Sequence, residues 1–478
     1  MSGQIKFGTD GWRAIIAEDY TFDNVRICAQ GLASYLLATT GKAANAVVGY
    51  DTRFGSEDFA AATAEVLAAN GIHTYLCTSA TPTPVVSHAV VDRTANAGVV
   101  ITASHNPGRW NGFKIKGPDG SSAEVEVIAE VEREIGVLVS SSTGVRRVDL
   151  DTAVSQGLVT MYDPAPRYKE QLRRLVDIEA IKGMDATVAI DSMYGAGSGY
   201  LADLLKGGKI RIDEIHAERN PLFPGIRPEP IGPNLAALFA RVTAKKAALG
   251  IATDGDADRV GLVDENGVFL NQHQVFALLC YYLLSVRKER GDIIRSVTTT
   301  EMISLLGTKY GVPVTVTRVG FKYIAPLMLE RNALIGGEES GGYGFRGHIP
   351  ERDGILAPLY FLDFMRQTGK TPSQLLQELY ALVGEHHYDR ADVELHHDDH
   401  ARVAADLRKL RPSKVGDVAV REVDLTDGVR LVLDDGAWVL YRLSGTEPLL
   451  RIYSEAESQK RVWELIREGG RLLGITVK

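Results

Sequence analysis

Three segments of the chain repeat one order of apolar and polar positions. In the first, Asp51 follows the apolar run 46–50 and begins a turn. An alanine-rich stretch over 58–70, Gly71 and a second apolar run over 72–77 come next. A short, unbroken apolar run is typical of a buried strand, and a glycine commonly ends a helix. The same order returns over 186–216 and 292–319. Each repeat predicts a strand–helix–strand unit, which favours a largely parallel sheet covered on both faces.

The C-terminal part of the chain follows another pattern. Short apolar runs separated by turn residues predict strands, with a helix after them, over 418–423, 429–433, 437–443 and 450–454. This order is typical of a small antiparallel α+β domain. The preceding stretch, 384–404, is rich in histidine and aspartate, and no spacing places its histidines on one face of a strand or helix. We therefore expect an interdomain linker with solvated histidines there, rather than a metal site.

The length of the chain bears on the number of domains. With 478 residues it is too long for one ordinary domain, and about three or four are expected. The repeats favour three α/β domains of similar build over one large sheet, with the C-terminal α+β domain as a fourth. The expected bounds are 1–155, 156–260, 261–384 and 385–478.

Composition narrows the class of protein. Apolar and charged fractions of 45% and 24% are ordinary for a globular protein. Three scattered cysteines, Cys28, Cys77 and Cys280, are too few for a disulfide framework or a zinc site. No leader-like segment opens the sequence, and the densest apolar run, 274–286, is too short to span a bilayer. We expect a cytoplasmic protein with no membrane partner.

The net charge of −8 argues against nonspecific binding of nucleic acid. Positive charge is nevertheless found in or beside several polar motifs, and we expect it to focus a basic cleft within an acidic molecule. The residues concerned are Arg13, His105, Lys114, Arg259, Lys322, Arg346, His348, Arg442 and Arg451.

Ser104 is a candidate nucleophile. It lies in the motif Thr-Ala-Ser-His-Asn-Pro, just after the predicted strand 98–102, in a turn broken by Pro107 and Gly108. A serine at a strand end can project its hydroxyl into a cleft. A catalytic triad is disfavoured, because the motif is not Gly-x-Ser-x-Gly and His105 is a sequence neighbour. The motif alone fits a turn-capping serine equally well.

Asp254, Asp256 and Asp258 are candidate metal ligands. On an extended segment this spacing would point all three carboxylates to one side, forming a hard oxygen site suited to Mg²⁺. An EF-hand loop also begins with this pattern. However, Arg259 stands where such a loop requires glycine, which excludes the calcium-loop interpretation. Arg259 is then a cation beside a crowded anionic site.

Two further loops carry groups suited to a charged, hydroxylated ligand. In Gly-Glu-Glu-Ser-Gly-Gly, over 337–342, the glycines allow close backbone approach, and the carboxylates and hydroxyl can bind sugar hydroxyls. Between two predicted strands, Arg442 precedes Ser444, Gly445 and Thr446. Backbone N–H groups in such a turn form an anion-binding concavity, to which Arg442 adds a guanidinium. A plain hairpin turn with an unrelated arginine remains the alternative for this last motif.

In this order and spacing, the motifs Thr-Ala-Ser-His-Asn-Pro, Asp-Gly-Asp-Ala-Asp-Arg and Gly-Glu-Glu-Ser-Gly-Gly resemble those of the α-D-phosphohexomutases. The similarity covers essentially the whole chain. It implies four domains around a central cleft, three α/β domains with mixed sheets and a smaller C-terminal α+β domain. It also implies that Ser104 is the phosphoserine, that the three aspartates and phospho-Ser104 hold Mg²⁺, and that glucose 1,6-bisphosphate is the intermediate and activator.

The resemblance implies further site residues. The expected catalytic set is Ser104, His105, Lys114, Arg259 and Lys322. The expected substrate-binding set is Thr9, Arg13, Gly320, Glu338, Ser340, Arg442, Ser444, Gly445, Thr446 and Arg451. Lys114 would be crowded by other cations, which would lower its pKa and suit it to proton transfer, or it would simply bind phosphate.

Two departures from the dual-specificity and mannose- or glucosamine-type members bear on the substrate. No histidine follows Gly320 in the segment 319–322, and Gly341 is followed by Gly342 instead of histidine. Both resemble the glucose-preferring, bacterial-type branch, so we expect a phosphoglucomutase acting as a monomer or homodimer on a small hexose phosphate. The alternatives are a phosphomannomutase or dual-specificity enzyme, a metal-dependent phosphatase, and a non-catalytic sugar-phosphate-binding protein.

Overall fold

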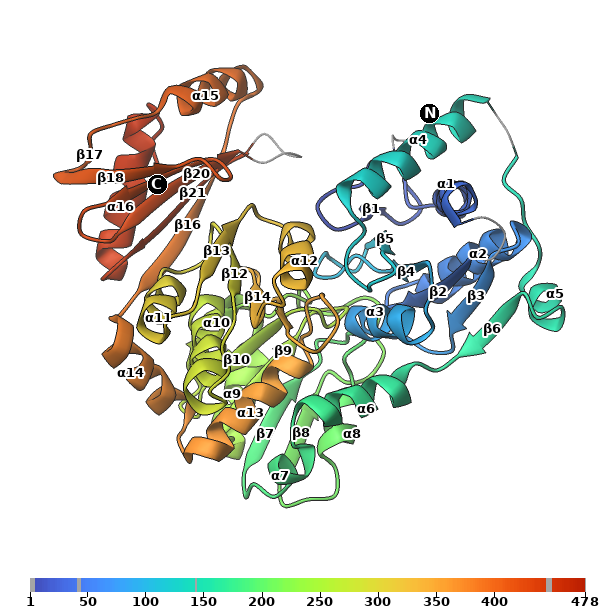
Figure 1. The fold of residues 1–478 in the computed structure, drawn as a ribbon, viewed down its shortest axis with the longest axis horizontal. Helices are drawn as coiled ribbons and strands as arrows, with labels where there is room; N and C mark the ends of the chain where they lie inside the picture. The colour runs from blue at the N-terminus through green and yellow to red at the C-terminus, as the bar shows by residue number, and fades with distance from the viewer. Residues whose placement is uncertain (1–4, 41–43, 142–143, 444–448, 478) are drawn as a thin grey trace.

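The computed structural model describes residues 5–40, 44–141, 144–443 and 449–477, with the backbone alone for residues 397 and 398. These residues form four sheets, each with its own helices, which follow one another from the N-terminus to the C-terminus (Figure 1). The α/β class, with three related mixed-sheet units and a C-terminal α+β unit, is confirmed. In the part of the chain described, no helix combines the length and the apolar character needed to cross a membrane.

The first sheet has the strand order β1-β5-β4-β2-β3-β6. β4, β2, β3 and β6 pair in parallel, and β5 and β1 continue the sheet antiparallel. α2 and α3 both pack against β2, which keeps this strand buried. The elements are β1 (Trp12–Ile15), α1 (Phe22–Thr40), β2 (Asn45–Tyr50), α2 (Ser56–Ala69), β3 (His73–Cys77), α3 (Thr83–Asp92), β4 (Ala97–Ile101), β5 (Trp110–Lys116), α4 (Val125–Ser141), α5 (Leu150–Ser155) and β6 (Val159–Tyr162).

The second sheet has the order β11-β10-β9-β7-β8, with β9, β7 and β8 parallel and β10 and β11 antiparallel. Its elements are α6 (Ala165–Leu175), α7 (Ile178–Lys182), β7 (Thr187–Asp191), α8 (Tyr200–Leu205), β8 (Arg211–Ile215), η2 (Gly232–Asn234), α9 (Ala236–Lys245), β9 (Leu249–Thr253), β10 (Val260–Val263) and β11 (Phe269–Leu270).

The third sheet has the order β13-β12-β14-β15, with only β15 antiparallel to its neighbour. Its elements are α10 (Gln272–Tyr281), η3 (Tyr282–Val286), β12 (Ile293–Ser296), α11 (Met302–Tyr310), β13 (Val314–Thr317), α12 (Phe321–Glu330), β14 (Ile335–Gly337), β15 (Tyr343–Phe345), α13 (Leu356–Thr368) and α14 (Pro372–Val383).

These three sheets share one feature that positions the site. In each, a parallel strand turns into an antiparallel neighbour, at β4–β5, β9–β10 and β14–β15. The loops at these three points carry Ser104, the segment 254–258, and the segment 338–342. The sequence repeats therefore correspond to related domains whose motif loops occupy the same topological position.

The fourth sheet is antiparallel throughout, in the order β16-β21-β20-β19-β18-β17. Its elements are β16 (His387–Glu394), α15 (His397–Lys409), β17 (Lys414–Val415), β18 (Val418–Asp424), β19 (Val429–Leu433), β20 (Trp438–Leu443), β21 (Leu449–Ala456) and α16 (Gln459–Leu472). The small C-terminal α+β domain is confirmed.

The expected polar linker over 384–404 is wrong. β16 pairs with β21 along its whole length, and α15 buries Val403 and Leu407 against the core of the fourth domain. Both elements are polar because β16 is an edge strand and α15 is a surface helix with one buried face. Only residues 384–386 separate α14 from β16.

The sheets also differ from the expected domain bounds at two places. β6, beyond residue 155, pairs with β3 in the first sheet, and β10 and β11, at and beyond residue 260, complete the second sheet. β6 and β11 are the edge strands of their sheets, and β10 pairs with both β11 and β9. All three follow the strand–helix–strand unit that the apolar pattern predicts.

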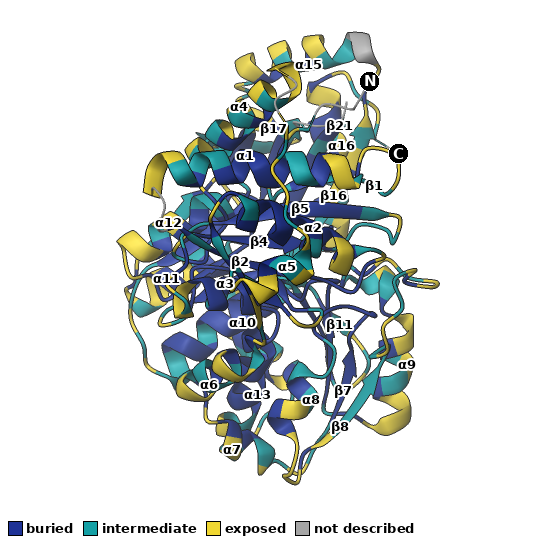
Figure 2. Cartoon of the chain, turned by 90° about the vertical axis from the view of Figure 1, so that its right-hand side faces the viewer, coloured by how far each residue is buried: buried dark blue, intermediate teal, exposed yellow. Residues whose placement is uncertain are grey.

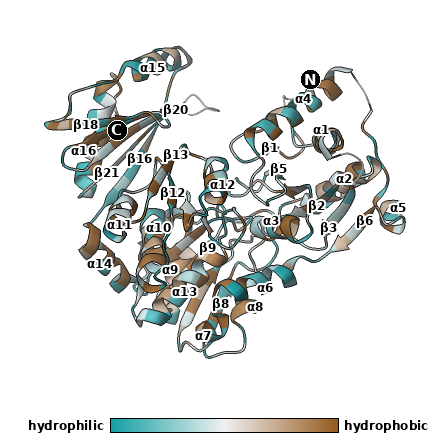
Figure 3. Ribbon diagram, viewed as in Figure 1, coloured by the Kyte–Doolittle hydropathy of each residue, from teal (hydrophilic) through white to brown (hydrophobic). Residues whose placement is uncertain are grey.

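Hydrophobic residues divide into separate cores. The first and fourth domains have their own, whereas strands of the second domain and helices of the third, such as β9 and α10, share one continuous core. Figure 2 shows the buried residues within the sheets and the exposed ones on the outer faces of α9 and α15. In Figure 3 the surface helices α6 and α15 are largely hydrophilic. The second and third domains thus form a common base that carries the first and fourth.

Candidate active site

A cleft of about 700 Å³ is lined by residues of all four domains. Ten of the expected site residues line it, namely Thr9, Arg13, His105, Arg259, Gly320, Lys322, Glu338, Ser340, Arg442 and Arg451. Ser104, Lys114 and the three aspartates are buried. Ser444, Gly445 and Thr446 lie outside the described residues.

The loop after β4 presents Ser104 in an unusual backbone conformation. Its φ is 51°, which is uncommon for a residue with a side chain and costs conformational energy. Its backbone N–H donates to the hydroxyl of Thr102 at 2.8 Å, and its own Oγ donates to Oδ2 of Asp254 at 2.8 Å. The hydroxyl of the first domain is thereby directed at the acidic loop of the second.

Arg53, which the sequence interpretation missed, holds the Ser104 loop in this conformation. Its side chain is fully buried and lies over the ring of Phe223. Its Nε contacts Asp51, and its two Nη groups donate at 2.6–3.0 Å to the carbonyl oxygens of Ser104, Asn106, Pro107 and Trp110. A planar guanidinium with all its nitrogens engaged is a rigid support for a loop. The strand-ending Asp51 was the available sequence signal.

His105 lies beside the Ser104 hydroxyl, with Nδ1 3.3 Å from Oγ. Burial lowers the pKa of His105 well below its ordinary value, and the nearby Arg259 and Arg13 lower it further. The imidazole is therefore neutral near pH 7, and the expectation that His105 adds positive charge to the cleft is wrong. A neutral ring next to a hydroxyl can act as a hydrogen-bond partner of either sense.

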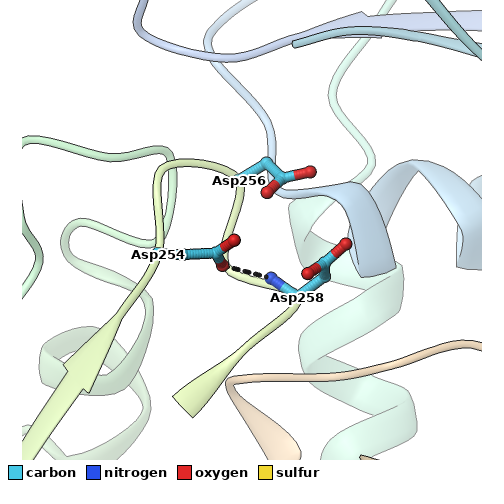
Figure 4. A group of neighbouring side chains, drawn as sticks. All are labelled: Asp254, Asp256 and Asp258. Carbon is cyan, nitrogen blue, oxygen red and sulfur yellow. Dashed lines mark hydrogen bonds between the residues drawn. The ribbon is translucent and has the colours of Figure 1, made fainter. Parts of the chain in front are cut away.

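Asp254, Asp256 and Asp258 converge in the loop between β9 and β10 (Figure 4). All three side chains are fully buried, and one oxygen of each lies within 4.8 Å of the others. The loop is a turn, with φ of 54° at Ala257, so the expected extended segment is wrong. The backbone N–H groups of Asp258 and Arg259 donate to Oδ1 of Asp254, each at 3.0 Å, and this closes the turn.

The charges of this loop fit a divalent cation. Burial raises the pKa of Asp254 well above its ordinary value, and the carboxylates of Asp256 and Asp258 raise it further. Among the described residues, Oδ1 of Asp256 and Oδ1 of Asp258 are buried without a hydrogen-bond partner. Unpaired buried carboxylate oxygens are costly, and a hard cation such as Mg²⁺ would satisfy them.

Lys114 on β5 is the counter-charge of this loop. Its Nζ lies 2.7, 3.1 and 2.8 Å from carboxylate oxygens of Asp256, Asp258 and Asp10. Burial lowers the pKa of Lys114, but these three carboxylates outweigh burial and raise the pKa above its ordinary value. The expected crowding by cations, with a lowered pKa, is therefore wrong, because the neighbours of Lys114 are mainly carboxylates.

Two expected cations of the lining face the same part of the cleft. Nη1 of Arg13 donates to Oδ1 of Asn106 at 2.8 Å. The guanidinium of Arg259 lies 3.8 Å from Asp258 and 3.6 Å from Glu229. Arg346 and His348 do not line the cleft. Arg346 donates to the carbonyl oxygens of Asn332 and Arg290, and His348 is buried against Asp353.

Glu338 and Ser340 form the sugar-sized part of the lining. Burial raises the pKa of Glu338, and its Oε1 accepts from the backbone N–H of Gly320 at 2.9 Å. In the described part of the chain, the Ser340 hydroxyl is buried without a partner. Lys322 lies nearby at the start of α12. A carboxylate and a free hydroxyl at one wall of a polar cleft suit hydrogen bonds to a sugar.

Arg442 and Arg451 form the opposite end of the lining, on the neighbouring strands β20 and β21. Arg442 donates through Nε to Oδ2 of Asp427 at 2.9 Å. Burial lowers the pKa of Arg442, and the charge of Asp427 outweighs this and raises it. Two permanent cations at one end of the cleft suit a phosphate.

Arg352, in the loop between β15 and α13, is a second residue that the sequence interpretation missed. Its Nη2 lies 2.8 Å from both Asp10 and Asp258, and its Nη1 lies 3.8 Å from Glu338. It therefore connects the first domain, the acidic loop and the sugar-sized wall through one side chain. The available sequence signal is its position in the segment 346–354, which follows the loop 337–342 and is rich in basic and turn residues.

The arrangement can support transfer of a phosphoryl group. A hydroxyl lies beside a buried set of hard oxygen ligands, and the cleft in front of it carries more cationic than acidic side chains. Phosphoryl transfer needs alignment and neutralisation of negative charge more than covalent help from the protein.

Family profiles match the chain in four consecutive regions. They are described as phosphoglucomutase/phosphomannomutase alpha/beta/alpha domains I, II and III and the C-terminal domain, and they match residues 4–138, 166–267, 271–383 and 391–468. The four matches together cover most of the chain in the order of the four sheets.

Relatives and solved structures agree with this match. The chain is 33% identical to a phosphoglucomutase/phosphomannomutase of Thermococcus kodakarensis, with 99% of each chain covered. It is 31% identical to a protein of Methanopyrus kandleri named as a probable phosphoglucosamine mutase, covering 96% of this chain and 95% of that one. The crystal structure of a phosphomannomutase candidate from Thermus thermophilus superimposes with a TM-score of 0.85 at 36% identity, covering 99% of this chain and 100% of that one.

Proposed function

Because the chain belongs to the phosphoglucomutase/phosphomannomutase family, whose members are isomerases that move a phosphoryl group, we propose that it interconverts glucose 1-phosphate and glucose 6-phosphate. The observation that carries the proposal is the contact of the Ser104 hydroxyl with the buried aspartate loop at the wall of a basic cleft. Phosphorylated Ser104 would donate its phosphoryl group to the free hydroxyl of the sugar phosphate and recover one from the other end.

Mg²⁺ is the metal that these ligands suit best. Asp254, Asp256, Asp258 and the phosphate on Ser104 would hold it, and it would supply neutralisation of charge on the transferring group. The chain contributes the orientation of the ligands. Lys114 and the N–H groups of the turn fix the carboxylates before any substrate enters.

The bound intermediate, glucose 1,6-bisphosphate, has to turn by about half a revolution so that its second phosphate meets Ser104. Contacts that serve both orientations belong to the middle of the ring. Glu338 and Ser340 are suited to this, since each offers an oxygen in the lining between the two phosphate-binding ends. Thr9 and Gly320 line the same stretch of the cleft, and Arg442 and Arg451 would hold the distal phosphate.

Proton transfer involves the sugar hydroxyl that accepts the phosphoryl group. Lys322 lines the cleft directly, whereas Lys114 is buried behind the lining against carboxylates. We therefore assign proton transfer to Lys322 and charge compensation in the aspartate loop to Lys114. His105 and Arg259 complete the catalytic set, beside Ser104 and Asp258 respectively.

The preference for glucose rests on the third-domain loops. Gly342 stands where mannose- and glucosamine-type members carry histidine, and a Cβ there would lie 2.3 Å from Cδ of Arg352. A side chain at this position would have to displace Arg352. The same wall thus offers a guanidinium instead of an imidazole. The absence of histidine after Gly320 is a second, separate difference from the dual-specificity members. Glucosamine 1-phosphate is the second candidate, because relatives of similar identity are named for it.

A coupled assay with Mg²⁺ and a trace of glucose 1,6-bisphosphate tests the proposal. We expect kcat/KM for glucose 1-phosphate to exceed the values for mannose 1-phosphate and glucosamine 1-phosphate by at least about tenfold. A higher value for either other sugar would overturn the glucose assignment and leave the mutase. Release of inorganic phosphate without isomerisation would indicate a phosphatase, and binding without any turnover would indicate a sugar-phosphate-binding protein.

A further inference from the structure

The turn between β18 and β19 of the fourth domain lies beside Arg442. Asp424 holds this turn by accepting from the backbone N–H and the hydroxyl of Thr426, at 2.8 and 2.6 Å. Gly428 follows with φ of 97°, and a Cβ there would lie 2.1 Å from the carbonyl oxygen of Tyr441. The turn is therefore packed directly on β20 in a defined conformation.

Asp427, within this turn, joins the fourth domain to the third. Its Oδ2 accepts from Nε of Arg442 at 2.9 Å and from the backbone N–H of Val319 at 3.0 Å. Next to it, Nε of Arg318 donates to the carbonyl oxygen of Thr426 at 3.2 Å. One carboxylate oxygen thus receives a bond from each side of the boundary between the two domains.

The connection continues to the sugar-binding wall. Val319 directly precedes Gly320, whose backbone N–H donates to Oε1 of Glu338 at 2.9 Å. Arg442, Asp427, the segment 319–320 and Glu338 therefore form one continuous path of hydrogen bonds and a peptide. The path runs from the phosphate-binding end of the cleft to its middle.

We infer that Asp427 is a positioning residue that orients the Arg442 guanidinium for the distal phosphate and sets its distance from Glu338. The inference rests on the proposed function of Arg442 as a phosphate ligand. A free arginine side chain loses conformational entropy when it is ordered by a ligand. The bond to Nε orders the guanidinium in advance. Among the described residues, it leaves the N–H donors of both Nη groups for a phosphate.

Asp427 acts on binding and not on the transfer step. Its own charge repels a phosphate, so its benefit comes only through the orientation of Arg442. Substitution should therefore raise KM and leave kcat largely unchanged. If charge repulsion outweighed orientation, substitution would lower KM instead, and this outcome would overturn the inference.

Asp427→Asn is the variant of choice, because it keeps the shape of the side chain and removes its charge. We expect KM for the sugar phosphate to rise about tenfold, because one charge-assisted hydrogen bond is lost. The kcat should stay within about twofold of the wild-type value. Asp434→Asn is the matched control. Asp434 is an exposed aspartate in the next turn of the same sheet and does not line the cleft. The KM of the Asp434→Asn variant should therefore equal that of the wild-type protein.

A double-mutant cycle separates positioning from a general structural effect. In the Arg442→Ala background, Asp427→Asn should change KM by less than about twofold, because the group that it orients is gone. An equal effect of Asp427→Asn in both backgrounds would contradict the inference, as would a KM equal to that of wild type in the single variant.

The cycle is independent of the choice of sugar. It is run on whichever hexose 1-phosphate the wild-type protein converts, so a wrong glucose assignment changes only the substrate. For a protein without turnover, the same pattern is expected in the dissociation constant of glucose 6-phosphate measured by calorimetry. Failure of the proposed function and failure of the Asp427 inference therefore give different results.

Discussion

The two ends of the cleft are built differently. At the Ser104 end, the hydroxyl, the three aspartates and Lys114 are buried, and buried supports such as Arg53 hold their loops. At the other end, Arg442 and Arg451 are only partly buried, and Arg442 is held by Asp427. The contrast indicates that the proposed reacting groups are held in buried loops before substrate binds. The proposed phosphate-binding arginines belong to a separate domain and, among the described residues, are more exposed.

The contact between the third and fourth domains, here called the joint, reflects the same contrast. Val297 of the third domain packs against Trp438 and Tyr453 of the fourth, and Glu455 accepts from the backbone N–H of Glu301 at 2.9 Å across the boundary. His386 binds the same carboxylate oxygen at 2.9 Å. The joint is thus a small apolar contact with a polar edge, while the second and third domains share a continuous core.

Ser104→Ala should have the largest effect. Without the hydroxyl there is no group to carry the phosphoryl, so we expect kcat/KM to fall by at least about four orders of magnitude. The dissociation constant of glucose 6-phosphate, measured by calorimetry, should stay within a few fold of the wild-type value, because Arg442 and Arg451 are unchanged. Normal turnover in this variant would contradict the proposal that Ser104 carries the phosphoryl group.

Asp254→Asn should come next. Loss of a metal ligand costs several kcal/mol of charge stabilisation, about a thousandfold in kcat. Without added metal, however, the variant should melt at the same temperature as wild type or higher, since one of three mutually repelling buried carboxylates is neutralised. Calorimetry in EDTA measures this. A lower melting temperature in EDTA would show that the trio stabilises the fold by itself.

Arg442→Ala should have a moderate effect confined to binding. A charge-assisted hydrogen bond to phosphate contributes about 2 kcal/mol, so KM should rise about thirtyfold with little change in kcat. Steady-state kinetics on the proposed substrate measure both. A fall in kcat at unchanged KM would instead place Arg442 in the transfer step and remove the contrast between the two ends.

The smallest effect is expected at the joint, from the titration of His386. Burial lowers the pKa of His386, but the hydrogen bond and charge of Glu455 outweigh it and raise the pKa above its ordinary value. The resulting stabilisation is fully present below the unfolded-state pKa, about 6.5, and is lost as the pH rises through the raised folded-state pKa.

His386→Gln should therefore lower the unfolding free energy by less than about 1 kcal/mol at pH 6, and by less still at pH 9. Denaturant-unfolding curves of the variant and the wild-type protein at pH 6 and pH 9 measure the difference. His387→Gln, at an adjacent and more exposed histidine paired with Glu385, is the matched control. A larger destabilisation at pH 9 than at pH 6 would contradict the expected direction of this pH dependence.

Local sequence predicted most of the elements and pointed to the candidate reacting groups. The apolar runs and glycine ends marked β2, β7 and β12 and the helices after them, because a buried strand and a helix end each impose their own local composition. Ser104, the aspartate loop and the segment 337–342 stood out for a similar reason: each packs several polar groups and glycines into a short turn.

Tertiary structure alone decided the rest. The charge state of Lys114 depends on carboxylates from two other segments, and burial makes His105 neutral, so neither could be inferred from neighbouring residues. Arg53 and Arg352 had only weak local signals in the sequence, because they act through contacts with distant loops. β16 and α15 read as a polar linker because an edge strand and a surface helix bury only one side, and the partner that covers that side exists only in the folded chain.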